Sequence, residues 1–219
     1  MKKEDHRTRV AAERRERMRR RLFESAMQLA ATKGPAATSI DDVIQAADVS
    51  RGSFYKYFEA PEALFAALAL EIMNEIIQMA EPAVQRVADP AQRVAIGMRL
   101  VIELASRNRQ VAGFLVRLDW SDAREGGVLL EFVRRDIAQA IREGHFLAIP
   151  MRLALNIVSM TVLGSIHALL GMRSRKAYTE QAVASGLRAL GMPPGEALRL
   201  ATLDLPSPEP LEGGLLAPA

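Results

Sequence analysis

The chain has no cysteine and little aromatic content, with one Trp, three Tyr and seven Phe among 219 residues. The absence of cysteine excludes disulfides, thiolate metal sites and thiol nucleophiles. The three histidines, His6, His145 and His167, lie too far apart in the sequence for a metal-binding spacing. The sequence also has no glycine-rich phosphate loop and no nucleophile motif. We therefore expect no catalytic residues, no metal and no cofactor, and an enzyme is the class that the sequence supports least.

Long apolar runs are scarce as well. No apolar run precedes Leu22, so we expect no secretory signal and a cytoplasmic protein. The most apolar stretch, residues 151–172, approaches the length of a membrane span. It lacks a flanking aromatic belt, and polar side chains interrupt it at Arg152, Asn156, Ser159 and His167. A buried helix in a core or subunit interface is the better interpretation, and we expect no membrane association.

Positive charge is concentrated at one end of the chain, whose net charge is +3. Residues 1–21 hold ten Lys and Arg against four Asp and Glu, whereas the remaining residues hold 19 against 22. Such a basic arm favours an anionic partner. Nucleic acid fits better than a membrane, because no aromatic or leucine stripe accompanies the charges. Contacts with phosphates would be sensitive to salt and independent of base sequence. The alternative is a solvated, disordered tail.

Residues 39–58, SIDDVIQAADVSRGSFYKYF, have the pattern of two short helices joined by a tight turn. Ser39 and Ser50 are good N-cap residues for the two helices, and Asp42 lies where a carboxylate completes a capping box. Apolar residues at helical spacing follow each cap. Asp48 falls at the turn, where Asp tolerates left-handed backbone geometry. This is the layout of a helix-turn-helix, whose second helix enters the DNA major groove.

The same segment resembles the signature of the TetR-type (TetR/AcrR, tetracycline-repressor-like) transcriptional regulators. The positions that match in register are Ser39, Ile40, Val43, Ala47, Val49, Ser50, Gly52, Ser53, Phe54, Tyr55, Tyr57 and Phe58. The resemblance covers roughly residues 1–80, and the remainder matches only a general all-helical plan. Two positions depart from the pattern: Asp48 stands where the family usually has Gly, and Pro61 where it often has Lys. The proline suits the first turn of a helix, although a phosphate contact would be lost.

The resemblance implies a set of DNA-contacting residues. They are Thr38, Ser39, Arg51, Gly52, Ser53, Tyr55, Lys56 and Tyr57. Arg51 is the first candidate for a base contact, since its planar guanidinium can bind guanine through two acceptors. Gly52 would leave room for the backbone to approach DNA, and the tyrosine hydroxyls would contact phosphates. The structural alternatives are capping alone for Ser39, a packing ring for Tyr55 and a solvated charge for Lys56.

Hydrophobic periodicity predicts an all-α fold of about nine to ten helices. We expect a disordered basic arm over residues 1–13, a helix-turn-helix domain over 14–60, a linking helix over 61–80, a regulatory domain over 81–203 and a flexible tail over 204–219. The tail is rich in Pro and Gly, a composition typical of disorder. Outside the helix-turn-helix, the expected helices cover residues 14–32, 61–80, 90–105, 108–120, 125–145, 151–172 and 177–190.

By the same resemblance, the C-terminal domain binds a small molecule and forms a homodimer through residues 150–190. A dimer also suits two recognition helices that must reach successive major grooves, about 34–36 Å apart. Candidate pocket residues, which are more often core, are Met98, Ile102, Phe114, Leu118, Trp120, Phe132, Met160 and His167. The few internal charges favour an apolar or amphipathic effector.

These observations predict a sequence-specific transcriptional regulator. It would be a dimeric repressor that a small, mainly apolar ligand releases from a palindromic operator in double-stranded DNA. The alternative function is a ligand-blind architectural or co-regulatory DNA-binding protein.

Overall fold

The computed structural model describes residues 2–118, 128–209, 211 and 213–216. In these residues the chain forms ten α-helices, a short 3-10 helix at Pro35–Ala37 and no strand, which confirms the predicted all-α fold. The helices are α1 (Lys2–Lys33), α2 (Ile40–Ala46), α3 (Arg51–Phe54), α4 (Pro61–Gln85), α5 (Pro90–Arg107), α6 (Arg109–Leu115), α8 (Val128–Arg142), α9 (Met151–Leu169), α10 (Lys176–Ala189) and α11 (Pro194–Ala201).

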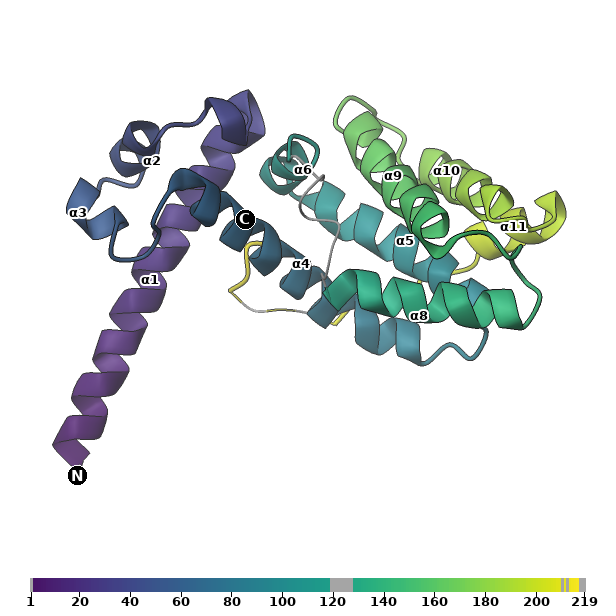
Figure 1. Cartoon of the computed structure of the whole chain (residues 1–219), viewed down its shortest axis with the longest axis horizontal. Helices are drawn as coiled ribbons and strands as arrows, with labels where there is room; N and C mark the ends of the chain where they lie inside the picture. Colours follow the sequence, from purple (N-terminus) through teal and green to yellow (C-terminus); the bar gives the residue numbers. More distant parts are fainter. Residues whose placement is uncertain (1, 119–127, 210, 212, 217–219) are drawn as a thin grey trace.

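Two parts are visible in Figure 1, a head formed by α1 to α3 and a helical body formed by α5 to α11. The long helix α4 runs from the head into the body, as expected of the linking helix, and Pro61 opens it in the first turn. A second connection joins α6 to α1. A Cβ added at Gly113 of α6 would lie 3.0 Å from the carbonyl oxygen of Ala31, so the two backbones approach closely there.

The core of the head is formed by apolar residues from all three of its helices. Phe58 lies 5.8 Å from Phe23 and 6.1 Å from Phe54, measured between ring centroids. Other buried members are Leu22, Ala26, Met27, Val43 and Ala47. Leu22 and Ala26, Val43 and Ala47, and Phe54 and Phe58 are each four residues apart, so the head's fold is specified largely by local patterning.

Helix α5 lies at the centre of the body, where it contacts α4, α8, α9, α10 and α11. A buried ion pair ties it to α8, with Arg93 Nε 2.9 Å from Asp136 Oδ1. The remaining donors of Arg93 bind the carbonyl oxygens of Val87 and Ala88 and the side chain of Gln139. Each nitrogen of Arg93 therefore has a hydrogen-bond acceptor, which offsets the cost of burying the charge.

The basic arm differs from its expected state. Helix α1 begins at Lys2, whereas we expected disorder over residues 1–13. The arm contains neither Gly nor Pro, and Arg9 pairs with Glu13 one helical turn later at 3.7 Å. Local propensity therefore outweighs the repulsion between its basic residues. Figure 1 shows this half of α1 projecting beyond the rest of the head.

The helices of the body also differ in places from the prediction, for example in α6, which ends at Leu115 and not at residue 120. Helix α4 continues to Gln85 and includes Pro82, where we expected it to end at residue 80. A proline is tolerated there because it removes only one hydrogen bond, close to the C-terminal end. Helix α11 was not predicted, since its eight residues give too short a periodic pattern.

The expected flexible tail is partly docked in the structure, and that prediction is wrong for residues 213–216. Leu215 and Leu216 are buried, and their amides donate to the two carboxylate oxygens of Glu75 at 2.8 and 2.9 Å. Composition suggested disorder, but two adjacent leucines supply enough apolar surface to hold the segment against α4.

By length and hydropathy alone, α4 and α9 could each cross a membrane. In the fold, 44% and 39% of their respective most apolar windows are buried inside the protein. A core helix of a globular domain passes the same test, so hydropathy alone is weak support for a membrane role.

Candidate DNA-binding surface

Helix α2 is fixed at its start by the capping box that the sequence predicts. The Asp42 amide donates to Ser39 Oγ at 3.2 Å, and the Ser39 amide donates to Asp42 Oδ2 at 2.8 Å. Lys33 at the end of α1 donates to the same carboxylate oxygen at 2.6 Å. This contact, followed by the hydrogen bonds from Ser39, holds the pKa of Asp42 well below its ordinary value. The start of α2 is thus anchored to α1.

The turn between α2 and α3 is fixed by Asp48. Its φ angle is 49°, the left-handed geometry that Gly would adopt at less cost. Arg21 of α1 donates to the Asp48 carbonyl oxygen at 3.2 Å and to its carboxylate at 3.1 Å. The turn is therefore intact with Asp in place of Gly. The Asp48 carboxylate also adds a contact with Arg21 that Gly could not make.

Helix α3 is shorter than the sequence suggested, with Ser50 as its N-cap and Phe54 as its buried inner residue. Ser50 Oγ accepts from the Ser53 amide at 3.1 Å, and the two hydroxyls are 2.9 Å apart. Residues 55–57 continue as a turn. The small helix is nevertheless anchored at both ends, by its N-cap hydrogen bond and by the buried ring of Phe54.

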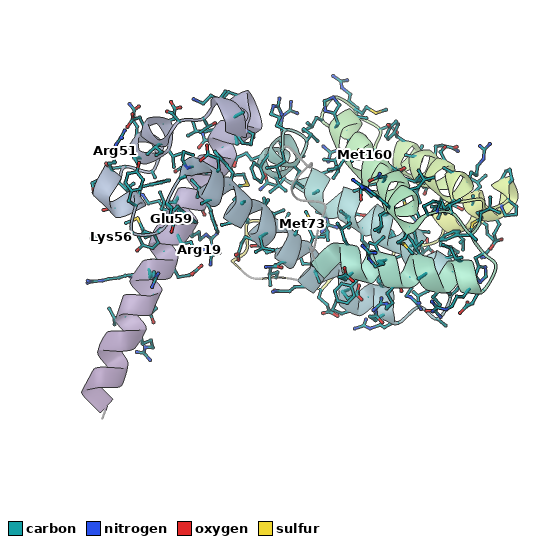
Figure 2. The ribbon with its side chains drawn as sticks, in the orientation of Figure 1. Arg19, Arg51, Lys56, Glu59, Met73 and Met160 are labelled. Carbon is teal, nitrogen blue, oxygen red and sulfur yellow. The ribbon has the colours of Figure 1, made fainter. Side chains whose placement is uncertain are left out.

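Arg51 and Lys56 lie at the outer end of the head, away from the body (Figure 2). Both side chains are exposed. The guanidinium of Arg51 donates to Asp41 Oδ1 at 2.5 Å, and this contact raises the pKa of Arg51. Asp41 also lies in the first turn of α2, where a carboxylate complements the helix N-terminus. The structure adds that Asp41 orients the arginine in the free protein.

Neither the backbone conformation nor the packing of the protein requires glycine at position 52. Its φ angle is not in the left-handed region, and a Cβ placed on it would meet no atom within 4 Å. The absence of a side chain therefore leaves an open patch of backbone at the start of α3. Such a patch is what close approach to a ligand or to DNA requires.

The two tyrosines differ in their surroundings. Tyr55 is 48% exposed and packs edge-to-face on Phe54, with centroids 5.6 Å apart. Tyr57 is half-buried and lines an open hollow of about 410 Å³ together with Arg15 and Arg19 of α1. The sequence gave no sign of this hollow, because it depends on where α1 crosses the end of the helix-turn-helix.

Thr38 differs from its predicted role. It is 5% exposed, and its hydroxyl donates to the Gly34 carbonyl oxygen at 2.8 Å. Thr38 therefore stabilises the connection before α2 and is not part of the exposed surface. The neighbouring Ser39 is exposed, although its hydroxyl is engaged in capping.

The predicted pocket residues that the structure describes differ in their burial. Met98, Ile102 and Phe114 are fully buried in the core, where Phe114 packs on Phe65 with centroids 6.3 Å apart. Leu118 and Phe132 are half-buried. A hollow of about 60 Å³ in the body has other lining residues, namely Ser106, Arg107, Arg109, Ala112, Ile166, Leu169, Leu170 and Arg175.

Two further pocket candidates lie on the surface, and one falls outside the described residues. Met160 on α9 is 43% exposed (Figure 2). His167 is exposed as well, so both lie on the surface of α9. They share an exposed stripe with Leu153 and Gly164, at helical spacing. Sequence could not tell an outward apolar stripe from an inward one. Trp120 lies outside the described residues.

Comparison with protein families gives two matches that together span both parts of the fold. The family described as "Bacterial regulatory proteins, tetR family" matches residues 22–68. The family described as "Tetracyclin repressor-like, C-terminal domain" matches residues 89–202, more than half of the chain. No curated protein matches the chain.

Several solved structures have the same fold, and three of them are compared with this chain. RolR in complex with resorcinol is 25% identical, with a TM-score of 0.70 over 90% of this chain and 98% of its own. A TetR-family transcriptional regulator from Syntrophomonas wolfei is 22% identical, with a TM-score of 0.65 over 81% and 96%. AibR in complex with isovaleryl coenzyme A and operator DNA is 19% identical, with a TM-score of 0.59 over 79% and 97%.

Proposed function

The chain belongs to the tetR family of bacterial regulatory proteins, and from this premise we propose that it is a cytoplasmic, dimeric repressor of transcription. It would bind a palindromic operator and leave it when a small, mainly apolar ligand binds the body. The observation that carries the proposal is the exposed start of α3, where an oriented Arg51 adjoins the bare backbone of Gly52.

Within this proposal Arg51 reads a base. Its guanidinium exchanges Asp41 for the acceptors of a guanine in the major groove. Lys56 and Tyr55 contact phosphates beside the same groove, and Arg15 and Tyr57 bind phosphates on the flank where α1 crosses. The basic N-terminal half of α1 adds a further contribution that depends on salt and not on base sequence.

The exposed stripe of α9 supports a homodimer. It presents Leu153 and Met160 to solvent, at 48% and 43% exposure, and Gly164 between Met160 and His167. A Cβ at Gly164 would meet nothing within 4 Å, so a partner helix could approach closely there. Pairing α9 and α10 across a two-fold axis would cover this stripe and place two heads on one operator.

Effector binding would act through the two connections between body and head, α4 and the contact of α6 with α1. Met98, Ile102 and Phe114 are closely packed, so an apolar ligand in this region must displace core side chains. A ligand that binds the displaced arrangement better shifts the equilibrium toward it, and DNA affinity falls by the reciprocal factor. RolR and AibR were solved with resorcinol and with isovaleryl coenzyme A, and a small organic effector for this chain is proposed by analogy.

The test compares Arg51→Ala with Arg142→Ala, an exposed arginine on α8 in the body, by fluorescence anisotropy on a set of operator variants. We expect Arg51→Ala to weaken binding roughly 5- to 150-fold and to relax preference at one base pair per half-site. Arg142→Ala should bind like the wild type. Equal weakening on every operator variant would make Arg51 a phosphate contact.

The ligand-blind alternative is separated from this proposal by a thermal-shift screen with small apolar and amphipathic compounds. A compound that binds the folded protein must raise its melting temperature, and an effector must also release the operator. If no compound of a broad library raised the melting temperature, the architectural role would be favoured.

A further inference from the structure

We propose that residues 213–216 form a strap that fixes the angle between the DNA-binding head and the body. The inference rests on the proposed function, in which head position controls operator binding. The strap lies beyond residue 202, where the family match ends. Figure 1 shows the yellow C-terminal segment returning from α11 alongside α4.

The strap's anchor is Glu75, an acidic residue of α4 that is only 6% exposed. Its two carboxylate oxygens accept the amides of Leu215 and Leu216, one each, at 2.8 and 2.9 Å. Hydrogen bonds from amides to a charged acceptor are stronger than neutral ones, and losing them leaves a buried charge without partners. The leucine side chains are buried as well, so docking combines a polar anchor with apolar burial.

The strap contacts both parts of the protein at once. Arg20 of α1, in the head, donates to the Gly213 carbonyl oxygen. Asn108, at the junction of α5 and α6 in the body, donates to the Leu215 carbonyl oxygen at 3.3 Å. Four residues thus join the head, the linking helix and the body, so a change in the angle between α1 and α4 must break part of this set.

Gly214 packs so closely against Glu75 that a substitution at this position can disrupt the docking of the strap. A Cβ at this position would lie 2.6 Å from Glu75 Oε2 and 2.8 Å from its carboxyl carbon. The φ angle of Gly214 is outside the left-handed region, so alanine is allowed by the backbone and conflicts only with the docked carboxylate. Gly214→Ala should therefore release the strap and leave the rest of the fold unchanged.

Release of the strap should lower operator affinity. Two heads must be held at a fixed separation to reach successive major grooves, and a head that is free to tilt loses conformational freedom on binding. We expect Gly214→Ala to weaken operator binding roughly five- to fiftyfold, within the usual range of coupling between sites. The base preference should stay the same, because the residues of α3 are unchanged.

The experiment measures operator affinity and hydrogen exchange for the wild-type chain, for Gly214→Ala and for three further variants. Gly195→Ala is the matched control, since a Cβ there meets nothing within 4 Å. Glu75→Gln removes the anchor's charge and should weaken binding in the same direction. Combining Glu75→Gln with Gly214→Ala should add little further loss, because both act on one contact.

The outcomes are distinct. Slow exchange of the Leu215 and Leu216 amides in the wild type, faster exchange in Gly214→Ala and a parallel loss of operator affinity would support the strap. Unprotected amides in the wild type, or a released strap with unchanged or increased operator affinity, would overturn it.

A wild-type protein that selects no operator would contradict the proposed function instead. The strap would then be judged by exchange in α1 around Arg20, which Gly214→Ala should accelerate. Unchanged exchange in α1 would overturn it.

Discussion

Gly52→Ala should weaken DNA binding without destabilising the fold. Alanine adds one methyl group at a position where the structure leaves nothing within 4 Å, so no internal clash arises. Replacing Gly with Ala inside a helix stabilises it by about 0.5–1 kcal/mol, and less near the first turn. At about 2–4 °C per kcal/mol for a chain of this size, the melting temperature should stay the same or rise slightly.

Operator affinity, in contrast, should fall. If the backbone at Gly52 lies against DNA, the methyl group forces the head outward, and affinity should fall by about tenfold or more, as for loss of a good base contact. Gly97→Ala in α5 is the control, because its Cβ also meets nothing within 4 Å. Differential scanning fluorimetry and fluorescence anisotropy measure the two effects. A Gly52→Ala protein with wild-type affinity would refute the close approach.

Three further predictions follow from the same geometry. Tyr55→Phe should weaken binding to all DNA sequences alike without lowering the melting temperature, as measured by anisotropy and fluorimetry; unchanged affinity would make the ring purely structural. Arg15→Gln should reduce the slope of log affinity against log salt concentration by about 1, and an equal slope would remove Arg15 from the phosphate contacts. Met160→Glu should place a charge in the α9 pairing face and shift sedimentation toward monomer, whereas a persistent dimer would place the interface elsewhere.

The parts of the head that sequence predicted correctly are those with local causes. Ser39 and Ser50 cap their helices within three residues, and Phe54 and Phe58 face the core because they are one helical turn apart. Asp48 takes the left-handed turn by its own tolerance for that geometry. Such signals need no knowledge of the rest of the chain.

The features that sequence missed depend on distant partners. Glu75 meets the Leu215 amide 140 residues later, and nothing in the composition of either segment announces that contact. The Asp41 contact with Arg51 depends on how the turn folds back. Met160 and His167 have the same helical spacing whether α9 turns them inward or outward, so periodicity alone could not place them on the surface.

The central claim is sequence-specific binding by a two-fold dimer. In-vitro selection of sites from random duplex DNA, with the purified full-length protein, tests it most directly. The account predicts a palindromic consensus whose half-sites are centred about one helical turn, or a multiple of it, apart. Enrichment of no sequence, with only salt-sensitive binding to any duplex, would contradict it.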